Sequence, residues 1–341
     1  MRIREGERRT AWRMACILEV RDLRVVYRPR GGAASEALSG VTFSLERGEI
    51  LGVLGQSGSG KSTLATSLLG LFHSNACVAT GAVLFEGTDL LQSDPEELQT
   101  IRGRRISLIF QEPSVALHPT MRAGEQVRQV LAAHETNGRR ALADRTRAVL
   151  ETVFPEETDR ISRSYPHELS GGQRQRVLIA QAIACEPSVV IADEPTASLD
   201  PTTQMEILGV FRALQQRLGL AMIFITHNPA LLARFADRVL VLYAGKVMEM
   251  GPAETVLASP MHPYTQALLR SVPPLPGECS ELRKKKLAAI PGDSRAGLWP
   301  QRGCRFEPRC PERMEICKER EPALISLNDA RTVSCFKYES K

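Results

Sequence analysis

The chain contains several short runs of apolar residues that end at a glycine-rich or polar segment. Residues 50–54, 189–192 and 222–225 are three such runs, and each predicts a buried strand. Strands that are apolar on both faces are typical of parallel sheets. A helical pattern over 63–71 follows the first run, and residues 120–163 are helical in pattern with no strand signal. We therefore expect an α/β domain that carries a helical insert.

Other stretches predict strands that are exposed on one face. Residues 17–27 alternate apolar and polar positions, and 41–45 are the expected hairpin partner. The remaining elements that the pattern predicts are strands at 81–85 and 106–110, a capped helix at 94–102, and a closing hairpin of 238–243 with 246–250.

A glycine-rich segment, G-Q-S-G-S-G-K-S-T, joins the first buried strand to the helix that follows it. Strand, glycine loop and helix in this order predict a phosphate-binding site of the form G-x-x-x-x-G-K-[ST]. Its glycines let backbone N–H groups approach an anion without a Cβ clash. We expect Lys61 to reach the β- and γ-phosphates and the Ser62 hydroxyl to ligate Mg²⁺. A chance glycine loop is the alternative, and the flanking strand and helix argue against it. The residues assigned to the site are Gly55, Gln56, Ser57, Gly58, Ser59, Gly60, Lys61, Ser62 and Thr63.

Polar side chains follow three of the predicted strands, at the edge where open α/β sheets bind their ligands. Asp193 can hold Mg²⁺, and Glu194 beside it can act as a general base toward water. Gln111 is placed to touch Mg²⁺ or water, and His227 to contact a γ-phosphate; a loop glutamine and a structural histidine are the alternatives. Tyr27 ends the first predicted strand. Its ring could stack on an adenine, and an ordinary strand tyrosine is the alternative.

The sequence predicts a second anion site where a helix begins near residue 171. Ser170 can cap this helix, and the two glycines after it leave N–H groups facing outward. A glycine-capped helix without a ligand is the alternative. The segment comprises Leu169, Ser170, Gly171, Gly172 and Gln173, and a further helix start follows at Ser198, Leu199 and Asp200.

Composition limits the possible classes of protein. The 341 residues fit two domains or one large domain with an appendage, and 43% hydrophobic with 24% charged residues is ordinary for a globular protein. A net charge of +5 is too small to argue for nucleic acid. No apolar window is long enough to span a membrane. Residues 1–13 lack an apolar core, so they predict no secretory signal; they are a tail, or the true start is Met14.

From about residue 17 to residue 251 the chain resembles the ATP-binding subunit of ABC transporters. The resemblance implies a P-loop NTPase fold of ABC type, with an antiparallel β subdomain, a RecA-like core and a helical insert at about 112–185. It also gives Tyr27 the adenine-stacking role. The matching motifs are the Walker A loop at Gly55–Ser62, the Q-loop at Gln111, the LSGGQ signature at Leu169–Gln173, Walker B at Val189–Glu194, the D-loop at Ser198–Asp200 and the switch histidine at His227. Gln56 stands where close relatives often have Glu, and its side chain is expected to point away with little effect.

The family mechanism needs two such chains. ATP bound at the phosphate loop of one is covered by the signature of the other, with Glu194 as the base and Lys61, Gln111 and His227 in the catalytic set. Mg²⁺ is held by Ser62, Gln111 and Asp193. One loop and one signature imply a second ATPase subunit, expected to be a related but different chain. The resemblance also implies two transmembrane permease subunits, an extracytoplasmic solute-binding protein, and a peripheral place on the cytoplasmic face of the cell membrane.

The C-terminal part narrows the resemblance. Residues 261–269, M-H-P-Y-T-Q-A-L-L, resemble the C-terminal extension of the oligopeptide, dipeptide and nickel importer branch. This implies an ATPase that powers import of di- or oligopeptides, with nickel or another small solute as the alternative cargo. A soluble ABC protein acting on nucleic acid or ribosomes is the alternative from another class, and a single ATPase domain without a long insertion disfavours it. The expected division is a tail at 1–16, the ATPase domain at 17–254 and the extension at 255–341, whose basic run at 283–286 is solvated.

Four of the eight cysteines lie near the C-terminus, at Cys304, Cys310, Cys317 and Cys335. These cysteines could form disulfides, bind zinc or hold an iron–sulfur cluster, and free thiols are the alternative. A reducing compartment argues against disulfides, and the spacing is wider than that of common zinc sites. The importer branch that the chain resembles carries a [4Fe–4S] cluster in a G-C-x-F-x-P-R-C-P segment, which here is 303–311.

Overall fold

The computed structural model describes residues 16–28, 34–72, 76–136, 138–271, 289–292, 302–328 and 330–339. The expected N-terminal tail, except its last residue, and the basic run at 283–286 lie outside these residues. The chain divides into two compact units, which are described separately. We name each unit after the motif that it contains: the signature unit comprises the described residues 16–17, 46–49 and 92–225, and the phosphate-loop unit comprises the described residues within 18–45, 50–91 and 226–341.

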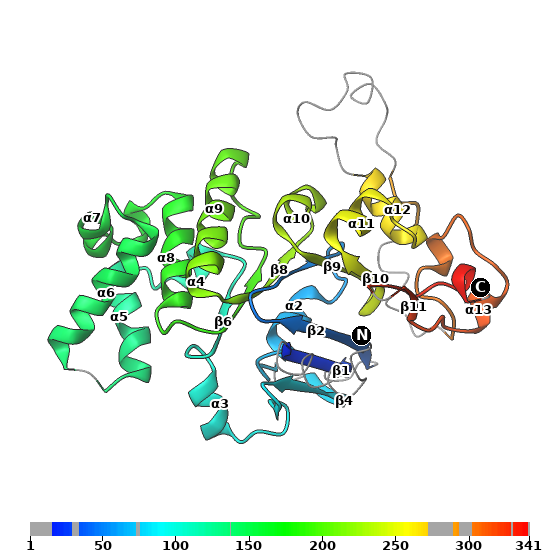
Figure 1. Ribbon diagram of the computed structural model, residues 1–341, viewed down its shortest axis with the longest axis horizontal. Helices are drawn as coiled ribbons and strands as arrows, with labels where there is room; N and C mark the ends of the chain where they lie inside the picture. Colours follow the sequence, from blue (N-terminus) through cyan, green and yellow to red (C-terminus); the bar gives the residue numbers. More distant parts are fainter. Residues whose placement is uncertain are drawn as a thin grey trace, which may run out of the picture. The chain divides into compact units, whose positions relative to one another are not determined.

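The phosphate-loop unit contains two sheets (Figure 1). The first is antiparallel, in the order β2-β1-β4-β5, with the predicted partners β1 and β2 side by side. The second contains β3 parallel to β9, with β10, β12 and β11 following in that order. The strands are β1 Cys16–Tyr27, β2 Ser35–Glu46, β3 Ile50–Leu54, β4 Ala76–Phe85, β5 Thr88–Asp89, β9 Arg238–Tyr243, β10 Lys246–Pro252, β11 Ile325–Asn328 and β12 Arg331–Val333.

The helices of this unit are short. The predicted hairpin of 238–243 and 246–250 is formed by β9 and β10, and helices α11 and α12 follow it before the C-terminal segment. The helices of the phosphate-loop unit are α2 Lys61–Ser67, α10 Pro229–Phe235, α11 Ala253–Ala258, α12 Pro263–Arg270 and α13 Ile316–Glu319, with 3-10 turns η4 Glu307–Arg309 and η5 Phe336–Tyr338.

In the signature unit, three strands pair in parallel in the order β6-β7-β8; β7 and β8 are the strands predicted from the apolar runs at 189–192 and 222–225, and β6 is the strand predicted at 106–110. Between β6 and β7, the described residues contain helices and no strand, which agrees with the predicted helical insert (Figure 1). The elements are α3 Pro95–Ile101, β6 Ile106–Ile109, α4 Pro113–Ala116, α5 Ala123–His134, α6 Arg139–Val153, α7 Thr158–Arg163, η1 Pro166–Glu168, α8 Gly171–Ile183, β7 Val189–Asp193, α9 Pro201–Leu218 and β8 Ala221–Thr226.

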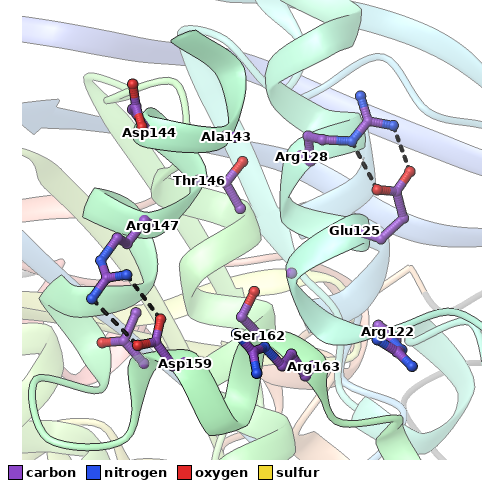
Figure 2. Close-up of a pocket in the computed structure, with 12 residues that line it drawn as sticks. Arg122, Glu125, Arg128, Ala143, Asp144, Thr146, Arg147, Asp159, Ser162 and Arg163 are labelled. Carbon is purple, nitrogen blue, oxygen red and sulfur yellow. Dashed lines mark hydrogen bonds and ion pairs between the residues drawn. The ribbon is translucent and has the colours of Figure 1, made fainter. Parts of the chain in front are cut away.

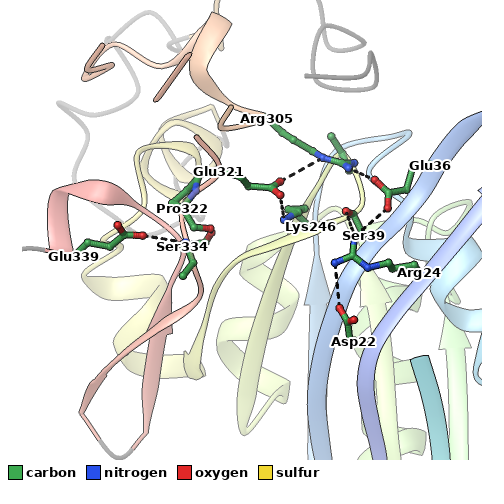
Figure 3. Close-up of polar contacts among 12 residues, drawn as sticks. Asp22, Arg24, Glu36, Ser39, Lys246, Arg305, Glu321, Pro322, Ser334 and Glu339 are labelled. Carbon is green, nitrogen blue, oxygen red and sulfur yellow. Dashed lines mark hydrogen bonds and ion pairs between the residues drawn. The ribbon is translucent and has the colours of Figure 1, made fainter. Parts of the chain in front are cut away.

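Charged side chains connect the C-terminal segment to a strand of each sheet of this unit (Figure 3). Arg305 forms an ion pair with Glu36 of β2, and Lys246 at the start of β10 pairs with Glu321 at 2.5 Å. Arg24 of β1 reaches the same Glu36 at 3.4 Å. Residues that the sequence assigns to an appended extension are therefore part of the same compact unit as the phosphate loop.

No helix in the described part of the chain is long and apolar enough to cross a membrane.

Candidate functional site

The phosphate loop leaves buried strand β3 and enters α2, as the sequence predicts. Gly60, the residue before α2, has φ of 103°, and a Cβ there would lie 2.7 Å from the carbonyl oxygen of Ala37. A Cβ at Gly55 would lie 2.4 Å from the carbonyl oxygen of Leu242. Close backbone contacts therefore require glycine at both positions, and at Gly60 the left-handed conformation requires it as well. Ser57, Gly58 and Ser62 are exposed, so this part of the loop is open to a ligand.

Lys61 is buried, and its ammonium group lies over the loop. Its Nζ donates hydrogen bonds to the carbonyl oxygens of Gly55, at 2.8 Å, and Gln56, at 3.1 Å. An ammonium group beside a glycine loop is the kind of cation that binds a polyphosphate. The Lys61 ammonium group therefore lies at the phosphate loop, and its contact with phosphate stays a prediction.

Gln56 makes two contacts that the sequence analysis did not foresee. Its backbone N–H donates to the phenol oxygen of Tyr264 at 3.1 Å, and its side-chain oxygen accepts from Nη1 of Arg309 at 3.2 Å. The side chain is therefore engaged by the C-terminal segment, where the sequence analysis expected little effect. Tyr264 and Arg309 lie 208 and 253 positions away, so no local signal in the sequence could have found them.

Tyr27 and His227 also belong to this unit. The Tyr27 phenol oxygen lies 3.1 Å from Oγ1 of Thr63, at the start of α2. The Tyr27 ring therefore reaches the phosphate loop from β1, and its stacking on adenine stays a prediction. His227 is exposed directly after β8, and Asn228 beside it caps α10 by accepting from the N–H of Ala230 at 3.0 Å.

In the signature unit, the predicted carboxylates lie at the end of β7. Asp193 is 8% exposed, and Glu194 has the left-handed φ of 46° with its N–H donating to the carbonyl oxygen of Ile225 at 3.0 Å. A non-glycine residue in this conformation costs about 1–3 kcal/mol, and such residues concentrate at functional sites. Gln111 follows β6, which pairs in parallel with β7, so both strands end at one edge of the sheet.

The signature segment forms a well-capped helix start. The Ser170 side chain accepts from the N–H of Gln173 at 3.2 Å, and the Gln173 side chain accepts from the N–H of Ser170 at 3.1 Å. This reciprocal pair is a capping box. A Cβ at Gly172 would lie 2.6 Å from Cγ2 of Thr203 on α9, so α9 requires a small residue there.

Asp200 in the predicted D-loop has a clear local role as the cap of α9. Its carboxylate accepts from the backbone N–H groups of Thr202, at 3.1 Å, and Thr203, at 3.0 Å. The hydroxyl of Thr203 also donates to this carboxylate, at 2.6 Å. These hydrogen bonds, first the one from the Thr203 side chain, lower the pKa of Asp200. Ser198 is exposed and Leu199 is half-buried.

The four C-terminal cysteines are free thiols gathered in one part of the phosphate-loop unit. The N–H of Cys304 donates to the carbonyl oxygen of Cys317 at 2.8 Å. Burial raises the pKa of Cys304 to about 12 and that of Cys310 to about 11, and the pKa of Cys335 is raised in the same way. Charges on the other cysteines of the group add to each increase, which places the thiols within electrostatic reach of one another.

No three metal-ligating side chains of the described residues are arranged to hold an ion. The donor set still suits a soft metal, because four free thiols are the ligands that zinc and iron–sulfur clusters require. The thiols would have to lose their protons and converge on the metal.

A pocket of about 460 Å³ lies among α5, α6 and α7 of the helical insert (Figure 2). Arg128 pairs with Glu125 at 2.5 Å, and Arg147 pairs with Asp159 at 2.9 Å. Most of its charged side chains are therefore neutralised in pairs. None of the site residues that the sequence predicts line this pocket.

Comparison with known proteins gives a consistent result. The family described as ABC transporter matches residues 38–197, and the family described as oligopeptide/dipeptide transporter, C-terminal region, matches 248–317. The chain is 41% identical over 321 residues to the oligopeptide transport ATP-binding protein OppD of Salmonella typhimurium, covering 94% of this chain and 93% of that protein. It is 39% identical to the dipeptide transport ATP-binding protein DppD of Bacillus subtilis, covering 96% of each.

Solved structures agree at the level of the fold. A dimeric post-hydrolysis state of the ATP-binding cassette MJ0796 with ADP and Pi is 29% identical. It aligns with a TM-score of 0.62 and covers 70% of this chain and 99% of that one.

Proposed function

We propose, from the premise that this chain belongs to the oligopeptide and dipeptide branch of the ABC transporter ATP-binding proteins, that it hydrolyses ATP to power import of di- or oligopeptides through a membrane permease. One observation supports this above all others. The phosphate loop, the signature and the C-terminal region of peptide transporters occur in one chain that matches OppD over 94% of its length.

The catalytic roles follow from the chemistry of each group. Lys61 neutralises the β- and γ-phosphates, and Ser62 and Asp193 hold Mg²⁺, with Gln111 as a further ligand. Glu194 activates water, and His227 contacts the γ-phosphate. The strained backbone of Glu194 and the contact of Lys61 with the loop carbonyls support these assignments.

Replacing the base tests the reaction. Glu194→Gln keeps the shape of the side chain and removes its ability to take a proton, so steady-state hydrolysis should fall by about 10²–10⁴-fold. ATP binding should be retained, because Glu194 does not contribute to the phosphate loop. Glu186→Gln is the control, since Glu186 also has a left-handed φ, of 52°, but lies away from the end of β7. Normal hydrolysis by the Glu194 variant would contradict its role as the base.

The second half of each ATP site comes from another ATPase subunit. One phosphate loop and one signature per chain leave each incomplete, and we expect the partner to be a related but different chain. Two permease subunits and an extracytoplasmic solute-binding protein complete the complex, at the cytoplasmic face of the membrane. Nickel or another small solute is the alternative cargo.

A pull-down of the tagged chain from solubilised membranes of its own host tests this assembly. Two multi-span proteins and a second ATPase should copurify, and transport by that complex can then be measured with peptides and with nickel. Recovery of only soluble partners, ribosomes or nucleic acid would overturn the transport function and leave the ATPase chemistry intact.

The four C-terminal cysteines are proposed to hold a [4Fe–4S] cluster. They are free, partly or fully buried, and within electrostatic reach of one another. Cys304, Cys310, Cys317 and Cys335 would be the ligands, and the cluster would brace this segment. Because the pKa values of the thiols are raised, loading should be more complete at higher pH.

Anaerobic purification with iron, sulfide and zinc assays tests the cluster. The wild-type chain should contain iron and acid-labile sulfide, and Cys304→Ser should lose both. Cys185→Ser is the matched control, because Cys185 is also a free, half-buried thiol but lies outside the C-terminal group. A colourless wild-type protein without iron would rule out the cluster, and zinc in its place would indicate the other metal.

A further inference from the structure

The phosphate loop is held from outside by two side chains of the C-terminal part. Tyr264 of α12 accepts the N–H of Gln56 at 3.1 Å, and Arg309 of η4 donates to the Gln56 side-chain oxygen at 3.2 Å. All three residues belong to the phosphate-loop unit. A loop residue whose backbone and side chain are both held in this way cannot turn without breaking two hydrogen bonds.

The contact with Tyr264 acts on the peptide group that orients Lys61. The N–H of Gln56 and the C=O of Gly55 belong to the same planar peptide unit. The Tyr264 phenol oxygen accepts the N–H of this peptide, while the Gly55 carbonyl oxygen of the same peptide accepts from Lys61 Nζ at 2.8 Å. Rotation of this peptide would move the carbonyl away from the ammonium group. Tyr264 therefore fixes the direction in which the loop presents Lys61.

Tyr264 is itself rigidly placed. Its side chain is completely buried, and its ring packs against Tyr243 and Phe306 with centroids 4.6 and 5.4 Å away. Its backbone N–H donates to Nδ1 of His262 at 2.9 Å. Burial raises the pKa of Tyr264, so the phenol stays neutral at physiological pH. A neutral phenol in a fixed position is a stable acceptor for a loop N–H.

Arg309 is also fixed by several partners. It is 5% exposed, its Nε donates to the carbonyl oxygen of Pro291 at 2.8 Å, and its Nη1 also donates to the phenol oxygen of Tyr243 at 3.3 Å. Its guanidinium carbon lies 5.9 Å from the centre of the Tyr243 ring. The guanidinium therefore reaches Gln56 from a prepared position, directly before Cys310.

We propose that Tyr264 and Arg309 are positioning residues of the ATP site, which act on bound phosphates through the Gly55–Gln56 peptide and Lys61. The proposal rests on ATP being the ligand of the phosphate loop, and it assigns the C-terminal part a role in binding that ligand. Held in place, the loop has less conformational freedom to lose when phosphate binds, and such preorganisation increases affinity.

Tyr264→Phe tests the proposal because it removes one oxygen and keeps the buried ring. Leaving the Gln56 N–H without its acceptor should raise the Kd and the KM for MgATP roughly 5- to 30-fold. We expect kcat to change less than about threefold, because the lost contact supports ground-state and transition-state phosphates alike. Tyr338→Phe is the matched control, since its hydroxyl donates to the carbonyl oxygen of Met261 at 3.2 Å and does not touch the loop.

A second readout separates positioning from a general structural effect. Inorganic tripolyphosphate carries the phosphates without adenine, so its inhibition constant should rise by the same factor as the Kd for ATP. A rise in the Kd for ATP without a rise in the inhibition constant of tripolyphosphate would place the defect on the adenine side of the site and overturn the proposal. An unchanged Kd in Tyr264→Phe, or an equal loss in Tyr338→Phe, would also overturn it. If the wild-type chain does not bind ATP, the proposed function fails before this question arises.

The contact with Arg309 is measured from the Gln56 side, because replacing a buried arginine can unfold the segment. Gln56→Ala should raise the Kd for MgATP by about 2- to 5-fold. Gln56→Glu should restore or exceed wild-type affinity, since a carboxylate forms a stronger, charge-assisted bond with a guanidinium. A Glu variant as weak as the Ala variant would rule out Arg309 as the partner that matters.

Discussion

The phosphate loop and the signature segment both present backbone N–H groups at the start of a helix, but they are stabilised differently. The start of α8 is held locally, by the Ser170–Gln173 capping box and a weak bond from Gln173 to Glu157 at 3.4 Å. The start of α2 has no side-chain cap, and Gln56 in its loop is held by residues more than 200 positions away. The described contacts of the signature are local, whereas those of Gln56 in the phosphate loop come from the C-terminal part.

Different stabilisation implies different sensitivity. A substitution that destabilises the C-terminal part should weaken ATP binding by the phosphate loop of the same chain. A substitution in the signature should leave that loop intact and should affect only the second ATP site that we propose the signature completes. The three predictions that follow test this difference, in order of decreasing effect.

The largest effect is expected from the buried ion pair that anchors α12. Glu249 is fully buried and accepts from Arg331 Nε at 3.2 Å and from the N–H groups of Met261 and His262 at 3.0 Å. Glu249→Ala leaves the buried Arg331 guanidinium without its carboxylate partner and should lower the free energy of unfolding by about 3–5 kcal/mol. Urea unfolding measures it, and the Kd for MgATP should rise because Tyr264 follows on α12.

Glu315→Ala is the control for this prediction. Glu315 pairs with Lys318 at 3.1 Å, but its side chain is 90% exposed, so its removal should leave both urea unfolding and ATP binding unchanged. If Glu249→Ala unfolded the C-terminal part and left the Kd for MgATP at its wild-type value, the phosphate loop would not depend on that part.

The second effect is a dependence on pH in the same region. Burial lowers the pKa of His262 to about 3, so the folded chain keeps this imidazole neutral, while the unfolded chain protonates it near pH 6.5. The contribution of neutral His262 to the free energy of unfolding is fully present above the pKa of the unfolded chain. It is lost as the pH falls toward the pKa of the folded chain, by up to about 1.4 kcal/mol per pH unit. Between pH 7.5 and 5, we expect a loss of about 2 kcal/mol in urea unfolding.

His262→Asn tests the source of this pH dependence. Asparagine can keep the cap on the N–H of Tyr264, which His262 Nδ1 provides at 2.9 Å, and it does not titrate. The variant should therefore show a flatter stability profile between pH 7.5 and 5. An unchanged profile would assign the acid sensitivity to other groups.

The smallest effect is expected at the signature. Ser170→Ala removes one acceptor from the capping box and should lower the stability of the signature unit by about 1 kcal/mol. Binding of MgATP to the isolated chain should stay within about twofold of wild type, while hydrolysis by the assembled ATPase pair should fall. Ser170→Thr should recover stability because it restores the capping oxygen. A weaker Kd for MgATP in the Ala variant would contradict the separation of the two regions.

Much of the ATP site could be predicted because its signals are local. The buried strand before the glycine loop, the carboxylates at the end of β7 and the cap at Ser170 all depend on residues within a few positions of one another. The structure confirms these elements. The strained φ of Glu194 could not be predicted, because it depends on a backbone hydrogen bond to Ile225 on a neighbouring strand.

By itself, the sequence determined the family and most of the elements, and it predicts which residues meet phosphate, since periodicity, glycine positions and motif spacing act over short distances. The tertiary structure alone decided that Gln56 contacts Tyr264 and Arg309. Contacts of this kind arise from chain packing over hundreds of residues. A hydrogen bond between such distant groups leaves no pattern in either segment.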